Sequence, residues 1–476
     1  MIKRYISPIL TLSLAATVVM SVSCSTSSKN NQQSIPAGYK VLGNSSFKLL
    51  PFKEKTLENG LKIVYVRDAS LPRVSFTALV RAGNVQDPAG KDGLNSLTAY
   101  LLEQGTQSRN ALKIADDLGQ MGTGLDISAG SDLTTIYADS LSKSSEELLA
   151  LYSDIVMNPS FDAGEITRMK SQMTAALRKK VDNPSNFAND EMDKFLFGAH
   201  PYAKDVNGSI ETLRGLSKQD VIKHYLTFFR PNNTSLAVVG NFNDAFEARV
   251  EEVFGKWVKR TIPEVKTAAA PTFDKTEVRL IVKKGLEQTQ IRIAQLGIER
   301  DDPRFLTLRL GNEVLGGSFA SKLNQKVRDD LGLTYSIYSY FDARKQPGGF
   351  KVSTFTKNET AGVTLDETLK VISEYSANGA TSKELSAGKN QLVGQFPRAI
   401  ETADRLAYNI LALEFYGVPL SYLTDFNKNV NGISLKTSNA AIQETMGTGK
   451  FKILVYGNES IIPQFEKYKP EIIRMK

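Results

Sequence analysis

Short strings from the first half of this chain recur in the second half, and that repetition restricts the possible folds more than any other feature. The matched strings are SLAVVGN (235–241) with FKILVYGN (451–458), EITRMKSQM (165–173) with ELSAGKNQL (384–392), and EQG (103–105) with LGG (315–317). The separation is roughly 215 residues each time, which is the length of a domain and far longer than a solenoid unit. The sequence therefore predicts a duplicated α+β domain, each copy a mostly antiparallel sheet with helices packed on it.

Composition indicates where the two copies are joined. Residues 260–275, RTIPEVKTAAAPTFDK, contain two prolines and a run of alanines, which is typical of a linker. We therefore expect an N-terminal domain over residues 47–259 and a C-terminal domain over residues 276–476. At 476 residues, the chain is long enough for each domain to bury its own core.

Local patterns predict the elements of the first domain. Asn59-Gly60 predicts a tight hairpin of two short strands, because both residues tolerate positive φ. The periodic leucines of residues 93–102 predict a helix. Further strands are expected over residues 73–81, 125–139 and 236–239, and further helices over residues 110–121, 144–157, 163–181 and 217–228.

The N-terminal residues predict where in the cell the protein is located. MIKR is a basic start, an apolar stretch follows, and Ser23-Cys24 closes it, which resembles a bacterial lipoprotein signal over residues 1–23. Ser21 departs from the usual pattern, and an ordinary secretory signal or an uncleaved anchor helix are the alternatives. Cys24 is the only cysteine, so we expect it to be lipidated, with a polar, flexible tether over residues 24–46. The expected location is the bacterial cell envelope, facing the periplasm.

The charge of the chain argues against one class of partner. The formal net charge is +8, but it is spread thinly and includes Lys3 and Arg4 of the expected signal. A nucleic-acid site would need clustered basic residues with stacking aromatic side chains, and the sequence has no such cluster. We therefore expect no nucleic-acid partner.

Residues 93–106, GLNSLTAYLLEQGT, resemble the active-site helix of the pitrilysin/insulinase-type zinc peptidases, the inverzincins. In that family G-L-x-H-x-x-E-H leads into a run ending Gly-Thr; two imidazoles one helical turn apart hold zinc, and the glutamate takes a proton from the bound water. Here the histidine positions hold Ser96 and Tyr100, and the glutamate position holds Ala99. A hydroxyl and a phenol are poor zinc ligands at neutral pH, and alanine cannot act as a base.

The rest of the expected metal site is also absent. The family's third ligand is a glutamate on a later helix, and that register falls here on Ala176. The only two histidines, His200 and His224, are too far apart to form an i, i+4 pair, so we expect packing or surface roles for both. We expect no catalytic residue, metal or cofactor in this chain, with zinc only in a partner subunit.

Segments from residue 50 onward resemble the same family, and the mitochondrial processing peptidase and its bacterial relatives are similar in length and domain count. The resemblance implies two homologous domains in a clamshell arrangement. RDDLGLTY (328–335) retains the Arg and Tyr that the family places opposite the zinc, so Arg328 and Tyr335 are the expected peptide-binding residues. A guanidinium and a phenol can donate hydrogen bonds to a carbonyl oxygen as it gains charge.

Other features nearby receive plainer interpretations. Gly316-Gly317 predicts a flexible turn, which could allow a peptide to approach closely. Tyr338, Tyr340 and Phe341 alternate as in a strand, and we expect them to pack in the sheet.

Three functions follow from these observations. The first is a non-catalytic subunit that binds peptide substrate and completes the site of a zinc-bearing homologous peptidase, by supplying Arg328 and Tyr335. The second is a structural lipoprotein that keeps the fold as a scaffold of an envelope complex, with no role in proteolysis. The third, a peptidase active by itself, is disfavoured by the four replaced positions.

Overall fold

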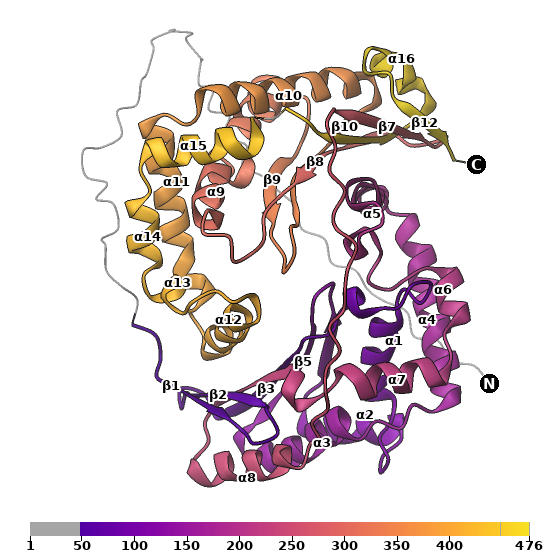
Figure 1. The fold of residues 1–476 in the computed structure, drawn as a ribbon, viewed down its shortest axis with the longest axis vertical. Coiled ribbons are helices and arrows are strands. Elements are labelled where there is room, and N and C mark those ends of the chain that lie inside the picture. The colour runs from indigo at the N-terminus through magenta and orange to yellow at the C-terminus, as the bar shows by residue number, and fades with distance from the viewer. Residues whose placement is uncertain (1–47, 448, 476) are drawn as a thin grey trace, which may run out of the picture. The chain divides into compact units, whose positions relative to one another are not determined.

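The computed structural model describes residues 48–447 and 449–475, which form two six-stranded sheets and the helices that cover them (Figure 1). The expected signal, the tether and Cys24 lie outside the described residues. Within the part that is described, no helix combines the length and the apolar character needed to cross a membrane.

The first sheet has the strand order β1-β2-β6-β3-β5-β4. β2 and β6 are parallel, and the other neighbours are antiparallel. Its strands are β1 (Phe52–Thr56), β2 (Lys62–Arg67), β3 (Arg73–Val80), β4 (Leu125–Ala129), β5 (Thr134–Leu141) and β6 (Thr234–Gly240). Burial alternates strictly along most of β5, so one face of that strand packs on helices and the other is only partly covered.

The second sheet has the order β12-β7-β11-β8-β10-β9 and repeats the plan of the first. β11 pairs parallel with β7 and antiparallel with β8, as β6 pairs with β2 and β3. The matched strings at residues 235–241 and 451–458 lie in these two equivalent strands, so the predicted α+β duplication is confirmed. Its strands are β7 (Glu277–Val282), β8 (Gln288–Leu296), β9 (Ile337–Asp342), β10 (Gly349–Lys357), β11 (Lys452–Gly457) and β12 (Glu471–Arg474).

The helices follow the same duplication. Those of the first half are α1 (Leu94–Leu101), α2 (Ala111–Met121), α3 (Ser145–Met157), α4 (Ala163–Val181), α5 (Pro184–Phe197), α6 (Ile210–Gly215), α7 (Lys218–Phe228) and α8 (Asp244–Gly255). Those of the second half are α9 (Phe305–Asn312), α10 (Ala361–Asn378), α11 (Ser382–Gln395), α12 (Ala403–Tyr416), α13 (Ser421–Thr424), α14 (Phe426–Gly432), α15 (Leu435–Met446) and α16 (Ile462–Phe465).

Two π-helical segments, η6 (Glu313–Gly317) and η7 (Asn324–Asp330), follow α9. Short 3-10 turns are η1 (Asn84–Gln86), η2 (Leu102–Gln104), η3 (Ser142–Ser144), η4 (Pro201–Ala203), η5 (Pro231–Asn233), η8 (Asn358–Thr360), η9 (Phe396–Ala399), η10 (Glu459–Ile461) and η11 (Glu466–Tyr468).

Each sheet also packs against one helix from the other half of the chain. α12 contacts β2, β3 and β6 of the first sheet, and α5 contacts β8 and β11 of the second (Figure 1). Apolar side chains of α5 share a buried cluster with residues of β7, β8 and β11. Ion pairs support both contacts: Arg73 Nη1 lies 2.6 Å from Asp404 Oδ2 of α12, and Lys351 Nζ lies 2.5 Å from Asp193 Oδ1 of α5.

The hairpin between β1 and β2 forms, but not by the predicted turn. Gly60 has φ 86°, whereas Asn59 does not have a positive φ. Asn59 instead uses its side chain: Oδ1 accepts from the N–H of Leu61 at 3.1 Å, and Nδ2 donates to the carbonyl oxygens of Phe254 and Trp257 at 2.8 and 2.9 Å. The asparagine is therefore needed for its amide, which ties the loop to the end of α8.

Candidate functional site

Helix α1 carries the zinc-peptidase-like frame, and a buried carboxylate holds its first turn. Asp87 accepts hydrogen bonds from the N–H groups of Gly93 and Asn95, both at 2.8 Å. Burial raises the pKa of the Asp87 carboxyl to about 7, although these two donors act in the opposite direction. Asp87 therefore satisfies amide groups that the N-cap residue, a glycine, cannot satisfy with a side chain.

Two residues that match the zinc-peptidase pattern, Gly93 and Thr106, have structural roles in this fold. Gly93 has φ 90°, and a Cβ there would lie 2.5 Å from the carbonyl oxygen of Asn207. Thr106, at the other end of the frame, is buried and donates from Oγ1 to Asp154 Oδ2 at 2.7 Å. The frame therefore holds the loop around residue 207 and the end of α3 in place, whether or not it binds metal.

The three replaced positions on α1 belong to the packed interior. Ser96 is 1% exposed and donates from Oγ to the carbonyl oxygen of Val206 at 2.6 Å. Ala99 is fully buried. Tyr100 is half-buried, its hydroxyl lies 3.4 Å from Asn207 Oδ1, and burial raises the pKa of this phenol. A tyrosine held in its neutral form is a poorer metal ligand still.

The side chains present here do not fit zinc. Ala176 is exposed on α4 and offers no donor. The Ser96 hydroxyl is already committed to a backbone carbonyl, and Tyr100 is neutral. Across residues 48–447 and 449–475 there is no group of three His, Cys, Asp or Glu side chains placed to hold a metal ion.

Both histidines are buried and hydrogen-bonded, so the packing role is confirmed and the surface role is wrong. His224 Nε2 lies 3.1 Å from Asn95 Oδ1 of α1, and burial lowers the pKa of His224 to about 3. His200 Nδ1 accepts from the N–H of Tyr202 at 3.1 Å, while its Nε2 lies 2.6 Å from Gln346 Oε1. Each imidazole thus fixes a neighbouring loop or helix through its hydrogen bonds.

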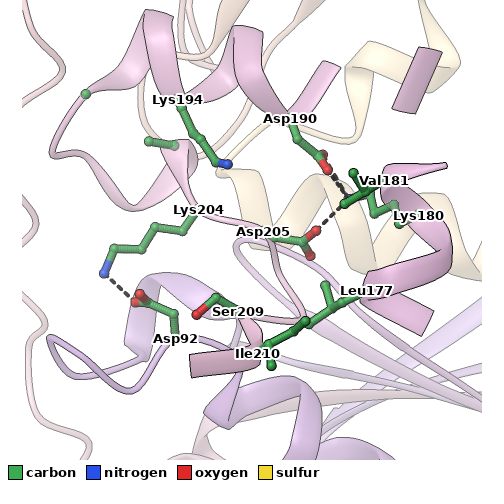
Figure 2. A pocket seen from close by; sticks show the side chains of 13 residues that line it. Asp92, Leu177, Lys180, Val181, Asp190, Lys194, Lys204, Asp205, Ser209 and Ile210 are labelled. Atoms are coloured by element: carbon green, nitrogen blue, oxygen red, sulfur yellow. Dashed lines mark hydrogen bonds and ion pairs between the residues drawn. The ribbon is translucent and has the colours of Figure 1, made fainter. Parts of the chain in front are cut away.

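A pocket of about 400 Å³ lies beside the start of α1, and the side-chain ammonium group of Lys180 lies in its wall (Figure 2). Lys180, one helical turn along α4 from Ala176, lies 2.7 Å from Asp190 Oδ2 and 2.6 Å from Asp205 Oδ2. Burial acts to lower the pKa of Lys180, but the two carboxylates outweigh it and leave that pKa raised. Lys204 pairs with Asp92 across the same pocket. Lysine–aspartate pairs therefore supply the charged side chains of this pocket.

Tyr335 lies on the surface, whereas the side chain of Arg328 is only 26% exposed. Arg328, on η7, pairs with Asp329 at 2.9 Å, and its guanidinium lies 4.4 Å from the centre of the Phe319 ring. Phe319 and Tyr335 are 73% and 84% exposed, respectively. In the described part of the chain no hydrogen bond joins Arg328 to Tyr335. Their role in peptide binding stays a prediction.

Two interpretations of the nearby residues are wrong. Gly316 is buried, and a Cβ there would lie 2.3 Å from Ser339 Oγ, so the glycine allows β9 to approach η6 and does not form a flexible turn. Tyr338 and Tyr340 are 46% and 36% exposed and stack on each other with ring centres 5.9 Å apart. Only Phe341 packs inward, against Phe350.

Sequence reasoning missed the Lys180 cluster and the role of Phe319. Lys180, Asp190 and Asp205 come from α4, α5 and the loop after η4, so no local motif joins them. Phe319 is nine residues before Arg328, and a spacing of that size predicts no contact. The one available signal for the cluster was the excess of both charges within residues 179–205.

Comparison with known proteins agrees with this geometry. The family model for insulinase (peptidase family M16) matches residues 62–208, and the model for the peptidase M16 inactive domain matches residues 215–392. The chain is 27% identical over 359 residues to an uncharacterized zinc protease YmxG of Bacillus subtilis, across 74% of this chain and 85% of the relative. It is 24% identical over 387 residues to the non-peptidase homolog YmxG of Helicobacter pylori, across 80% and 88%.

A solved structure shares the fold. The crystal structure of a peptidase M16 inactive domain from Pseudomonas fluorescens superposes with a TM-score of 0.80 at 28% identity, covering 86% of this chain and 98% of that one. The two sheets, the duplication and the matched sequence segments all support the same family assignment. The chain therefore belongs to the insulinase family of peptidases, M16.

Proposed function

We propose that this chain is the non-catalytic, peptide-binding subunit of a heterodimeric M16 metallopeptidase of the cell envelope. The observation that carries the proposal is a contrast within one molecule. Helix α1 has its ligand positions filled by packed or neutral side chains, while Arg328 and Tyr335 of the other half remain accessible. A partner subunit supplies the zinc and the base, and this chain supplies donors to the peptide backbone.

The surroundings of Arg328 suit that task. The exposed Phe319 ring lies under the guanidinium, and stacking leaves the in-plane N–H groups free to donate to a carbonyl. Asp329 is the present partner of Arg328, and it is itself half-exposed, so a substrate carbonyl can replace it at small cost. Tyr335, accessible over most of its side chain, adds a phenol donor.

The edges of the two sheets differ in a way that favours the first half as the place where an extended peptide pairs. Along β9, Asn324 Nδ2 donates to the carbonyl of Ile337 at 3.0 Å, and Asn312 Nδ2 donates to that of Ser339 at 2.9 Å. Along the equivalent edge strand β4, the described residues provide no outer backbone partner. Free edge groups accept an added strand, and the alternating burial of β4 would direct alternate peptide side chains inward.

The location completes the proposal. Lipidation of Cys24 would hold the subunit at the membrane, with the tether over residues 24–46 leaving the two sheets in the periplasm. Substrates would then be unfolded peptides or small proteins of the envelope. Loss of membrane association in a Cys24→Ser variant, measured by fractionation, tests this part separately from peptide binding.

Reconstitution with a zinc-bearing M16 homologue from the same cell tests the central claim. Arg328→Ala should lower kcat/KM on an unfolded peptide by about a hundredfold, the usual cost of removing one oxyanion donor. Arg474→Ala, at an exposed arginine on β12, is the matched control and should leave kcat/KM unchanged. Unchanged hydrolysis with Arg328→Ala would refute the role.

A structural lipoprotein is the second candidate. The observation in its favour is that Arg328 is already paired with Asp329 and that, in the described residues, no hydrogen bond joins Arg328 to Tyr335. Stable co-purification with an envelope complex that contains no peptidase, together with unaltered proteolysis on deletion of the gene, would favour this function over the first.

A further inference from the structure

A cavity of about 330 Å³ lies in the second half, away from α1 and from Arg328, between the start of α9 and the short helices α13 and α14. Arg300, Phe305 and Tyr422 line it, together with the polar side chains of Ser421 and Asn429. Its volume is within the range of small-ligand sites, and Arg300 is the cationic side chain of its lining.

Arg300 is held by aromatic rings on the wall of this cavity. Its guanidinium carbon lies 4.1 Å from the centre of the Phe305 ring and 4.6 Å from that of Tyr422. Stacking occupies the faces of the planar guanidinium and leaves its N–H donors at the edge. The side chain is therefore fixed in place by the two rings and by a hydrogen bond with Tyr422, which leaves further N–H groups of the guanidinium to donate.

A second arginine adjoins the first, and neither has an acidic partner. Arg309 Nη1 lies 3.3 Å from the Tyr422 hydroxyl. Throughout the described residues, no carboxylate lies within ion-pair distance of Arg300 or Arg309. Burial lowers the pKa of Arg300, and the nearby charge of Arg309 acts in the same direction. The two positive charges repel each other; Glu313 interacts electrostatically with Arg309, but it lies beyond ion-pair distance.

Two carboxylates also line the cavity, but both are paired elsewhere. Asp302 accepts from Arg304 Nη2 at 2.8 Å and from its backbone N–H at 2.7 Å. Asp301 lies 3.7 Å from Lys345 Nζ. These partners leave the positive charge near Tyr422 without compensation.

We propose that the cavity binds an oxyanion, with Arg300 as its main ligand, stacked between Phe305 and Tyr422, and with Arg309 adding a second positive charge. A planar carboxylate or a tetrahedral phosphate can each accept two hydrogen bonds from one guanidinium edge. The two natural sources are the C-terminal carboxylate of a peptide and inorganic phosphate. The site is independent of the zinc-bearing partner and of the role proposed for Arg328.

Calorimetric titration of the full-length protein in detergent tests the site with three probes: inorganic phosphate, a tripeptide with a free C-terminal carboxylate, and the same tripeptide as its amide. Binding of phosphate alone assigns the site to phosphate, and binding of the free acid but not the amide assigns it to peptide C-termini. Equal binding of acid and amide, or no binding of phosphate and acid, overturns the proposal.

Variants then locate the binding. Arg300→Met should weaken the bound probe by about tenfold or more, as expected for loss of a charged hydrogen-bond donor, and Arg300→Lys should weaken it less. Arg279→Met is the matched control, since Arg279 also stacks on a ring, 4.2 Å from that of Phe195, but is paired with Glu471 at 2.9 Å. If both Arg300 variants are folded by circular dichroism and bind as the wild type does, the site is not at Arg300.

Discussion

The Ser96 hydroxyl donates a hydrogen bond of 2.6 Å to the carbonyl oxygen of Val206. In the zinc peptidases that this helix resembles, a histidine would stand at position 96. Here the serine side chain makes a hydrogen bond to the backbone at that position. The side chain is 1% exposed, so a larger residue at this position must displace the chain around residue 206. The loss of the metal site is thus built into the packing of α1.

Restoring histidines to α1 should therefore destabilise the protein. We expect Ser96→His to lower the free energy of unfolding by about 1–3 kcal/mol, because it overpacks a closed interior and removes the bond to Val206. Tyr100→His, at a half-buried position, should cost less. Urea denaturation measures both. Zinc content measured by mass spectrometry should stay at background in the double variant; stoichiometric zinc with unchanged stability would contradict this account.

The lysine–aspartate cluster beside α1 should contribute to stability. Lys180→Met leaves Asp190 and Asp205 facing each other without their shared cation, and we expect a loss of about 1–2 kcal/mol on denaturant unfolding. Lys194→Met is the control, because Lys194 is more exposed and its pair with Glu191 is a surface pair on one helix, worth less than about 0.5 kcal/mol. Equal effects of the two substitutions would argue against a special role for Lys180.

Asp87 and Glu313 should each contribute stability that falls as pH rises from about 4 to about 7, whereas His224, whose pKa burial lowers to about 3, contributes in the opposite direction. Burial raises the pKa of both Asp87 and Glu313 to about 7, above the values 3.8 and 4.5 of the free side chains. The folded state therefore holds protons that the unfolded state has released, and its advantage is complete below pH about 4 and lost as pH rises through 7.

Glu313→Gln tests this pH dependence. It removes one of the two carboxyl titrations at nearly constant shape, so the stability of the variant relative to wild type should increase as pH rises from about 4 to about 7. Glu287→Gln, at an exposed position, serves as the control and should leave this difference near zero across the range. Identical pH profiles for wild type and Glu313→Gln would show that Glu313 is not protonated in the fold.

The side chain of Asn312 should be needed to satisfy the outer backbone groups of the edge strand β9. Its amide donates to the carbonyl of Ser339 at 2.9 Å and accepts from the Ser339 hydroxyl at 2.7 Å. Asn312→Ala leaves both buried groups without partners and should lower the thermal midpoint, at a cost of about 1–3 kcal/mol. Asn186→Ala, on the exposed surface of α5, is expected to be nearly neutral. Aggregation of the Asn312 variant on heating would further indicate an opened edge.

The sequence predicted the duplication, the α+β class and most elements because these depend on local period and on repeated strings. Residues 163–181 form α4 as expected, and the predicted helix at residues 93–102 is α1 with one residue fewer at each end. The hairpin at Asn59-Gly60 also formed, but through side-chain bonds of Asn59 that no dipeptide pattern reveals.

The features that the sequence did not predict are contacts between residues far apart in the chain. An amphipathic helix shows that it has an apolar face but not which sheet that face will meet, so the positions of α5 and α12 could not be read from their residues. For the same reason Gly316 was taken for a turn, because its close neighbour Ser339 lies on a strand further along the chain.

The placement of α5 and α12 has a consequence for how the molecule holds together. Each half donates a helix to the other, so the single chain is in effect a domain-swapped dimer fused end to end. A backbone cut within residues 260–275 would not release two independent domains, because α5 stays on one fragment and α12 on the other while each remains docked on the opposite sheet. The two halves are interlocked, because each sheet contacts a helix that the other half supplies.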